Sequence, residues 1–543
     1  MQATRTRSVR YQGSLRFDAS PLLVILGFVL LEIALAYPGA VVEADSVRVG
    51  YGIINGIITK LYFAARDLYG RSFSYGYYAL FWGLYPRLFN GFESLGAVMN
   101  GLNLISTAGA LWVFHRWVKA LFGGPVALAS LLLISATPVV FELGGYGHPE
   151  GPAFLALNLA ILALVRGAQG GPRAIHHLAV VGWGFAAAAL RADVLLAFPA
   201  LPFLAAAAAP SGRRGRAFVW ASILVGLAIG AFFAAQSWVV AMTPARIMPV
   251  PNSPFTGKVG MTDILIEYWR LGTSLGALTK GLAVWLTGLG PVLFVLGWIA
   301  ILAALRGRQR LYALTALAMI LPSAIFWLSN PTPSRHLLLT FLALVPAAAL
   351  WLQAVTRRPY ARTVLLVLAL NLVAMDAIYP ILVRNYHFYF VNLLPRRVNL
   401  WVPMGNPITA RIWARKQVAL ELDQMRQLAN TTEPRVLVCG AWVSMRLVHE
   451  LYARGDYQVD YLWKHDSFLY HITTPRTEYL IYDYGGPPAL SSKELLERVA
   501  AAGDYRDYAI AIAPSDQPVD GPAVVPPGYR ELPIALPAGI SRD

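Results

Sequence analysis

The chain contains a series of long apolar runs, each close to the length needed to cross a lipid bilayer. A spanning helix needs about 20 apolar residues, because the backbone in hydrocarbon can satisfy its hydrogen bonds only as a helix or a closed barrel. Continuous runs without alternation favour helices. We therefore predict an α-helical polytopic membrane protein with about eleven spans. The runs are 21–37, 95–118, 125–143, 151–165, 177–190, 194–209, 218–240, 282–305, 312–328, 337–355 and 363–383.

Composition and charge support a membrane protein and argue against a nucleic-acid partner. Hydrophobic residues make up 57% of the 543 residues and charged residues only 14%, with a mean hydropathy of +0.52. The net charge of +16 is divided among short clusters between the apolar runs, so we interpret these clusters as a signal of the orientation of the chain in the membrane. The single cysteine, Cys439, excludes an intrachain disulfide.

The basic clusters recur at every second connection, which predicts the orientation in the membrane. Under the positive-inside rule, the tail 1–20 is cytoplasmic and the chain after residue 383 is outside the cytoplasmic (inner) membrane. If the chain turns at Arg191, the later basic clusters fall on the same side of the membrane as the earlier ones. The two runs that flank Arg191 could instead form one kinked helix. The first run could also be a secretory signal, but its cleavage would remove the cytoplasmic start. The clusters are Arg5, Arg7, Arg10 and Arg16; Arg116 and Lys119; Arg166 and Arg173; Arg213, Arg214 and Arg216; Arg306, Arg308 and Arg310; and Arg357, Arg358 and Arg362.

Ionisable residues also gather in the connections predicted to lie outside. The insertion of such a group at the centre of a spanning helix costs about 2.5–3.5 kcal/mol of free energy, so ionisable residues near span ends usually have partners or a function. We expect several of these connections to form one site. They carry Glu43 and Asp45 in the first outer loop 38–94, "ELGGYGHPEG" at 142–151, "LRADV" at 190–194 and "NPTPSRH" at 330–336.

These motifs, in this order and on this side, resemble the GT-C superfamily of polytopic glycosyltransferases. The resemblance rests on the acidic motif "EADS" after the first run, "GHPE" before the fourth, "LRADVLLAFPAL", and "SRHLLLTFLALVPA" opening a late run. It covers about residues 21–383 and identifies no subfamily. It implies transfer of a sugar from a polyprenyl-phosphate donor to a glycan, lipid or protein acceptor on the outer face. A single displacement of this kind would be inverting.

Such a reaction needs a carboxylate to accept the proton of the attacking hydroxyl and a cation to hold the departing phosphate. The resemblance places Asp45 as the base, with Glu43 as the second choice. Asp45 could also cap the amphipathic helix predicted after it, which would lie on the membrane lipids. A divalent metal ion held by both acids would require extended backbone, because side chains two residues apart share a face only there. No cofactor is otherwise indicated.

The other site residues are assigned by residue type and position. We expect His148, Glu150 and Asp193 to bind substrate. We expect a cationic set to bind the donor phosphate, since the planar guanidinium group of arginine matches the geometry of a phosphate. Three alternatives stay open, namely capping by Glu150, snorkelling of Arg335 and simple pairing of Arg191 with Asp193. The cationic set is Arg335, His336, Arg191 and Lys280.

Two regions follow a different pattern. The loop 241–281 is rich in proline and glycine and is long enough to be a lid or a binding loop. After a linker at 384–403, short apolar strands alternate with helices and predict an extracytoplasmic α/β domain at 404–543. The four predicted strands are "PRVLVCG", "YQVDYLW", "EYLIYDYGG" and "DYAIAIAP". In a protein of this resemblance, that domain would cover the site and select acceptors, or simply support the membrane part.

Two other functions remain open. A transporter or flippase of lipid-linked saccharides would line a path across the bilayer, often with matched halves, which the sequence does not show. A polymerase or ligase acting outside on pyrophosphate-linked sugars is a closer rival.

Overall fold

A computed structural model gives the structure of the protein. It describes residues 20–35, 76–77, 80, 95–145, 149–241, 285–286, 288–307, 309–328, 338–356, 360–385, 423–439, 447, 450–451, 458–464, 467–483, 507–512, 528 and 530–532.

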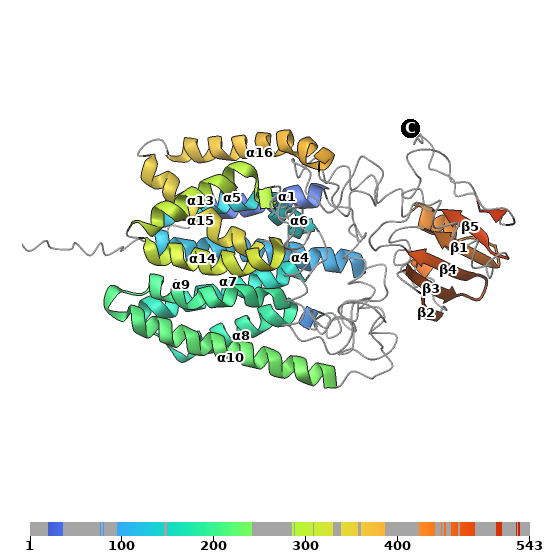
Figure 1. Ribbon diagram of the computed structural model, residues 1–543, viewed down its shortest axis with the longest axis horizontal. Helices are drawn as coiled ribbons and strands as arrows, with labels where there is room; N and C mark the ends of the chain where they lie inside the picture. Colours follow the sequence, from blue (N-terminus) through green and yellow to red (C-terminus); the bar gives the residue numbers. More distant parts are fainter. Residues whose placement is uncertain are drawn as a thin grey trace, which may run out of the picture.

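The described part of the membrane region is a bundle of apolar helices (Figure 1). Each of the predicted apolar runs contains helix, with short non-helical breaks at residues 136–137 and 290 in the part of the chain that the structure describes. The first part holds α1 (Ser20–Leu35), α4 (Leu95–Phe122), α5 (Gly124–Ser135), α6 (Pro138–Gly145), α7 (Glu150–Gly170) and α8 (Ala174–Leu190). It continues with the 3-10 helices η3 (Ala192–Ala200) and η4 (Ser211–Arg213) and with α9 (Leu201–Ala208), α10 (Arg214–Ala241), α13 (Pro291–Leu305), α14 (Arg310–Leu328), α15 (Leu338–Val355) and α16 (Tyr360–Asn385).

Two runs differ in detail from continuous helices. The run predicted at 125–143 is divided into α5 and α6. The hydroxyl of Thr137 donates to the carbonyl of Ile134 at 2.7 Å, and Pro138, which has no N–H, is the first residue of α6. The run at 194–209 begins as η3, with Pro199 inside it, and continues as α9. In the described residues, three helices are long and apolar enough to cross a membrane, and the apolar stretches of the others cover 10–17 residues. The number of crossings therefore stays a prediction.

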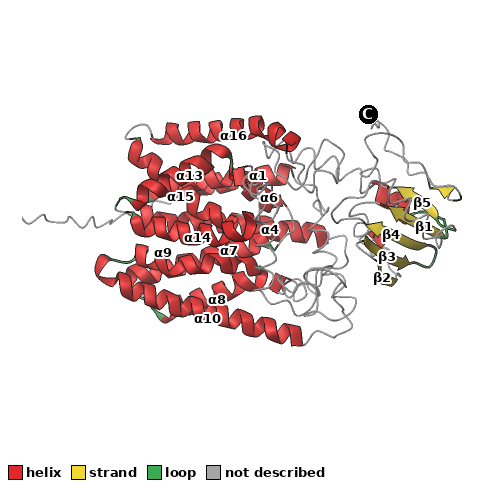
Figure 2. Ribbon diagram, in the orientation of Figure 1, coloured by secondary structure: helices red, strands yellow, loops and turns green. Residues whose placement is uncertain are grey.

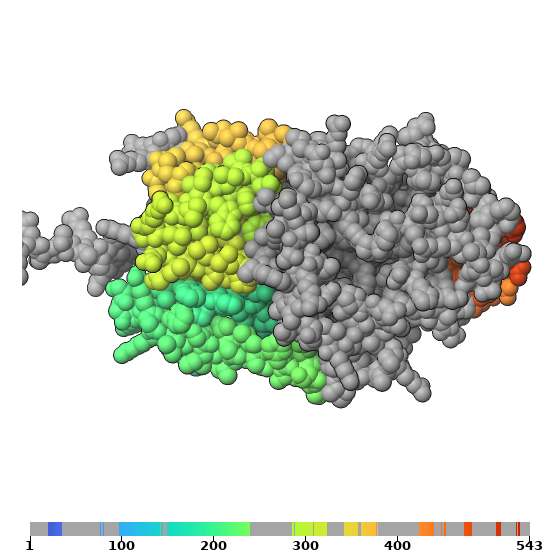
Figure 3. All heavy atoms as spheres, in the orientation of Figure 1, coloured from blue at the N-terminus to red at the C-terminus, as the bar shows by residue number. Residues whose placement is uncertain are grey.

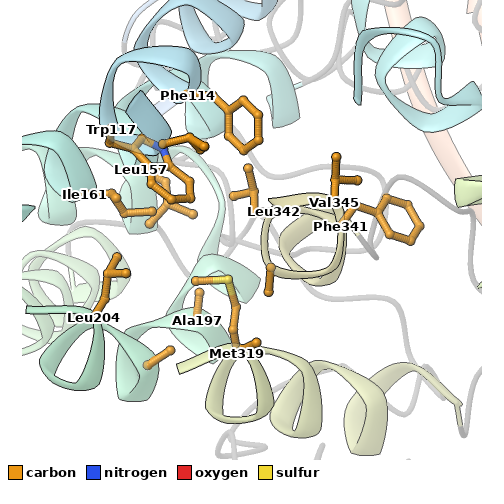
Figure 4. Close-up of a cluster of buried hydrophobic side chains, with 14 of the residues drawn as sticks. Phe114, Trp117, Leu157, Ile161, Ala197, Leu204, Met319, Phe341, Leu342 and Val345 are labelled. Atoms are coloured by element: carbon orange, nitrogen blue, oxygen red, sulfur yellow. The ribbon is translucent and has the colours of Figure 1, made fainter. Parts of the chain in front are cut away.

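The centre of the bundle joins helices that are far apart in the sequence. Side chains of α4 and α7 meet those of η3, α9, α14 and α15 in one buried apolar cluster (Figure 4). The labelled members are Phe114, Trp117, Leu157, Ile161, Ala197, Leu204, Met319, Phe341, Leu342 and Val345. Large apolar side chains such as Leu23, Ile105 and Val373 are exposed instead, which is typical of a surface that faces lipid.

The described basic clusters lie at one end of the bundle. Short links join α4 to α5, α7 to α8, α9 to α10, α13 to α14 and α15 to α16, and these links share the left end of Figure 1. Contacts tie that end together: the rings of Phe122 and Tyr312 are 4.8 Å apart, and Gln169 Nε2 donates to the Ala120 carbonyl at 2.8 Å. The clusters near these links are thus on one side, as predicted; which side of the membrane it is stays a prediction.

The bundle surface is continuous over the helices that follow α8. In the space-filling view, described side chains of α9 and α10 in green, of α13 to α15 in yellow-green and of α16 in gold lie on one face (Figure 3). Asn371 of α16 joins two of these helices. Its Oδ1 accepts the backbone N–H groups of Val292 and Leu293 at 3.1 Å, and its Nδ2 donates to the Leu289 carbonyl at 3.1 Å.

The C-terminal strands form one mixed sheet (Figure 2). Its order is β2-β3-β4-β1-β5-β6. The strands are β1 (Arg435–Cys439), β2 (Gln458–Lys464), β3 (Ser467–Thr473), β4 (Glu478–Asp483), β5 (Ala509–Ile512) and β6 (Arg530–Glu531). β1 pairs in parallel with β4 and β5, while β3 is antiparallel to both of its neighbours. The sequence predicted four of these strands and missed β3 and β6. The domain limits at 384–403 and 404–543 stay predictions.

Candidate functional site

Three charged residues meet at the end of the bundle opposite the basic links. Glu150 is the first residue of α7, and Arg191 and Asp193 lie between α8 and the start of η3. Arg191 Nη1 donates to Glu150 Oε1, and Arg191 Nε donates to Asp193 Oδ1 at 2.6 Å. We call these three residues the ionic triad.

The local backbone explains why the triad forms. Arg191 is extended (φ −156°, ψ 112°) and ends α8, with its N–H bonded to the Ala187 carbonyl at 2.9 Å. Its own carbonyl accepts the N–H of Val194 at 3.2 Å, which starts η3. The predicted turn at Arg191 is therefore confirmed, and one continuous kinked helix is excluded. Pro149 precedes α7, where its missing N–H costs little, and Glu150 lies in the first turn, where the helix dipole favours an acid.

Burial makes the electrostatics of the triad strong. The side chains of Glu150, Arg191 and Asp193 are 4%, 14% and 14% exposed. One cation against two anions leaves one formal negative charge. The pairing of Arg191 with Asp193, left open by the sequence, is thus present, and Glu150 joins it. Because two carboxylates already engage the guanidinium, this geometry favours a positioning role for Arg191 over phosphate binding.

One described residue of the predicted first outer loop lies close to the triad. Gly76 and Tyr77 belong to the loop predicted at 38–94. A Cβ atom added at Gly76 would lie 2.9 Å from the carbonyl carbon and oxygen of Ala189, so only glycine allows this approach. Tyr77 is fully buried. Gly76 therefore lies close against α8, two residues before Arg191.

Buried polar side chains of α1 and α4 lie near the same end. Glu32 of α1 is buried, and a Cβ atom added at Gly144 of α6 would lie 2.8 Å from its Oε1. Asn103 and Thr107 of α4 are buried beside Gly151 of α7. Sequence reasoning missed these three polar residues. The available signal was a polar residue within an apolar run, which in a membrane usually marks a partner or a function.

The remaining predicted site residues lie outside the described residues. These are Glu43, Asp45, His148, Lys280, Arg335 and His336. Their roles, including a metal ion held by Glu43 and Asp45, stay predictions. Within the described ranges, no three side chains of His, Cys, Asp or Glu gather in a way that would hold a metal ion.

Comparison with known proteins gave structural matches only. No protein-family model matches the chain, and no curated protein matches it. The crystal structure of ArnT from Cupriavidus metallidurans bound to undecaprenyl phosphate is 13% identical, with a TM-score of 0.47, over 79% of this chain and 84% of that one. The apo structure of ArnT gives the same values. An oligosaccharyltransferase of Archaeoglobus fulgidus, tethered to an acceptor peptide containing the NVT sequon, is 14% identical, with a TM-score of 0.42, over 80% of this chain and 63% of that one. Similarity at this level describes the course of the backbone and does not assign an activity.

Proposed function

We propose that the protein is an inverting glycosyltransferase that moves a sugar from a polyprenyl-phosphate donor to an acceptor at the outer face of the cytoplasmic membrane. The observation that carries the proposal is the largely buried ionic triad at the end opposite the basic links, with Gly76 of the predicted first outer loop close beside it. Acidic groups of two connections that the sequence predicts to be outside, and Gly76 of a third, thereby share one end of the bundle.

In the proposed reaction, an acceptor hydroxyl attacks the anomeric carbon of the donor. The new bond joins the acceptor oxygen to that carbon, the bond from the carbon to the phosphate oxygen breaks, and polyprenyl phosphate leaves. Asp45 takes the hydroxyl proton, with Glu43 beside it. Arg335, His336 and Lys280 hold the leaving phosphate, because a cation aimed at developing charge lowers the barrier. Arg191 is reassigned from phosphate ligand to the residue that orients Glu150 and Asp193.

The distribution of charge favours an enzyme over a transporter. A flippase needs polar groups along a path across the bilayer. In the bundle, the acidic side chains that the structure describes belong to the end with the triad, and the described basic side chains other than Arg191 belong to the opposite end. A site at one face suits a reaction between a lipid-borne donor and a water-borne acceptor.

The test supplies labelled polyprenyl-phosphate sugars to the purified protein in lipid nanodiscs and measures transfer to acceptors. Asp45→Asn should lower the rate by about 10²–10⁴, the usual contribution of a general base. Glu43→Gln should have a smaller effect. Asp507→Asn is the matched control, because this aspartate is 85% exposed and lies two residues before β5, and its substitution should leave the rate unchanged. Full activity of both Asp45→Asn and Glu43→Gln, or lipid transport without sugar transfer, would overturn the proposal.

A further inference from the structure

Asn103 of α4 lies between the end of α6 and the start of α7. It is completely buried, and its Nδ2 donates a hydrogen bond to the carbonyl of Leu143 in the last turn of α6. On its other side is Gly151, the second residue of α7, where an added methyl group would overlap the Asn103 amide. One side chain therefore contacts both helix ends that border the predicted outer connection.

This arrangement packs the end of α6 and the start of α7 around one amide group. The last carbonyls of a helix have no partner within the helix, and a buried one is costly to leave without a donor. Asn103 supplies that donor to α6. Gly151 has no side chain, so the first turn of α7 can approach the amide, and Thr107 Oγ1 would lie 3.1 Å from an added Cβ atom. Removal of the amide would leave space beside Gly151, into which the first turn of α7 can shift.

Glu150 directly precedes Gly151, and its carboxylate accepts from Arg191. Hydrogen bonds between arginine and a carboxylate depend on the orientation of both groups. A displacement of the first turn of α7 would therefore weaken the bond to Arg191, although Asn103 is no member of the ionic triad.

We propose that Asn103 is a positioning residue that holds Glu150 in register with Arg191. It acts through the backbone of α7 and needs no contact with substrate. Its effect on catalysis rests on the proposed function, whereas the alignment of Glu150 with Arg191 does not.

The chain offers a matched control in Asn158, which is also buried and lies on α7. Its Oδ1 accepts from Trp117 Nε1, and its Nδ2 donates to the Phe154 carbonyl, both at 2.8 Å. Asn158→Ala therefore also removes two amide hydrogen bonds from the bundle. It does so about two turns away from Glu150, in the direction of the basic end.

The first experiment measures thermal unfolding of the full-length protein in detergent. In the native background, Glu150→Gln and Arg191→Gln together should lower the melting temperature by less than the sum of the two single shifts, because they remove one shared interaction. In an Asn103→Ala background the two shifts should become additive. In an Asn158→Ala background they should stay non-additive. Non-additivity that persists in Asn103→Ala would overturn the proposal, and Asn103→Ser, which keeps a shorter donor, replaces the alanine variant if that variant does not fold.

The second experiment measures sugar transfer by the same variants. Asn103→Ala should lower kcat by about 10²-fold with an unchanged KM for the donor, as expected when a small misplacement affects a site that still binds. Asn158→Ala should change neither. A kcat unchanged by Asn103→Ala would limit Asn103 to a structural role and overturn its part in catalysis. If the wild type transfers no sugar, the proposed function fails, while the unfolding experiment still decides the positioning role.

Discussion

Replacing Arg191 by leucine tests how the ionic triad is held. The substitution leaves the carboxylates of Glu150 and Asp193, which are 4% and 14% exposed, without the guanidinium that bonds to both. Breaking a buried ion pair by removing one partner costs about 3–5 kcal/mol, because the remaining charge stays buried. That corresponds to a factor of about 10²–10⁴ in the folding equilibrium.

Companion variants separate charge from volume. Arg191→Lys should be intermediate, because an ammonium group is a single point charge and cannot present a planar fork to two carboxylates. The triple variant Arg191→Leu, Glu150→Gln, Asp193→Asn should recover much of the lost stability, because no unpaired buried charge remains.

The assay is reversible unfolding of the purified protein in detergent, followed by tryptophan fluorescence. The control is Arg435→Leu in β1, whose side chain is 50% exposed and whose Nε lies 3.2 Å from Glu478 Oε2. A pair with this exposure contributes about 0–1 kcal/mol. The reasoning is refuted if Arg191→Leu costs no more than Arg435→Leu, or if the triple variant is as unstable as Arg191→Leu alone.

Two further predictions concern other contacts of the bundle. Asn371→Leu should lower the free energy of unfolding by about 2 kcal/mol, because it removes the side chain that caps α13; Asn371→Asp, which keeps the acceptor, should lose less in the same unfolding assay. Gly76→Val should lower sugar transfer by about tenfold or more, because the new side chain would push the first outer loop away from Ala189. Its control is Gly182→Val in α8, where an added Cβ atom meets nothing within 4 Å, so equal activity of the two variants would contradict the docking of this loop.

Much of the fold is visible in the sequence, because the length of an apolar run is a local property. The runs predict helices in the right places, and the spacing of basic residues predicts which helix ends lie together. The break at Thr137 and Pro138 was missed, because the apolar run continues through it and only the local hydrogen bond and the proline end α5. The strands β3 and β6 were missed too; β6 has only two residues.

The candidate site was less predictable. The motifs placed Glu150, Arg191 and Asp193 at the same end of the bundle, and the pairing of Arg191 with Asp193 was one of the alternatives that the sequence left open. The bond from Arg191 to Glu150 joins residues 41 positions apart, and no local pattern indicates it. The same is true of Asn103, whose partner Leu143 is 40 residues away.

The sequence by itself determined that the chain is a set of apolar helices with its basic residues at alternate connections, because both features depend on residues close together in the chain. Only the tertiary structure decided that Arg191 is shared by two carboxylates, that Gly76 docks on Ala189 and that Asn103 lies between α6 and α7. These contacts depend on which helices pack side by side, and that is set by the shapes and volumes of side chains that meet from distant parts of the chain.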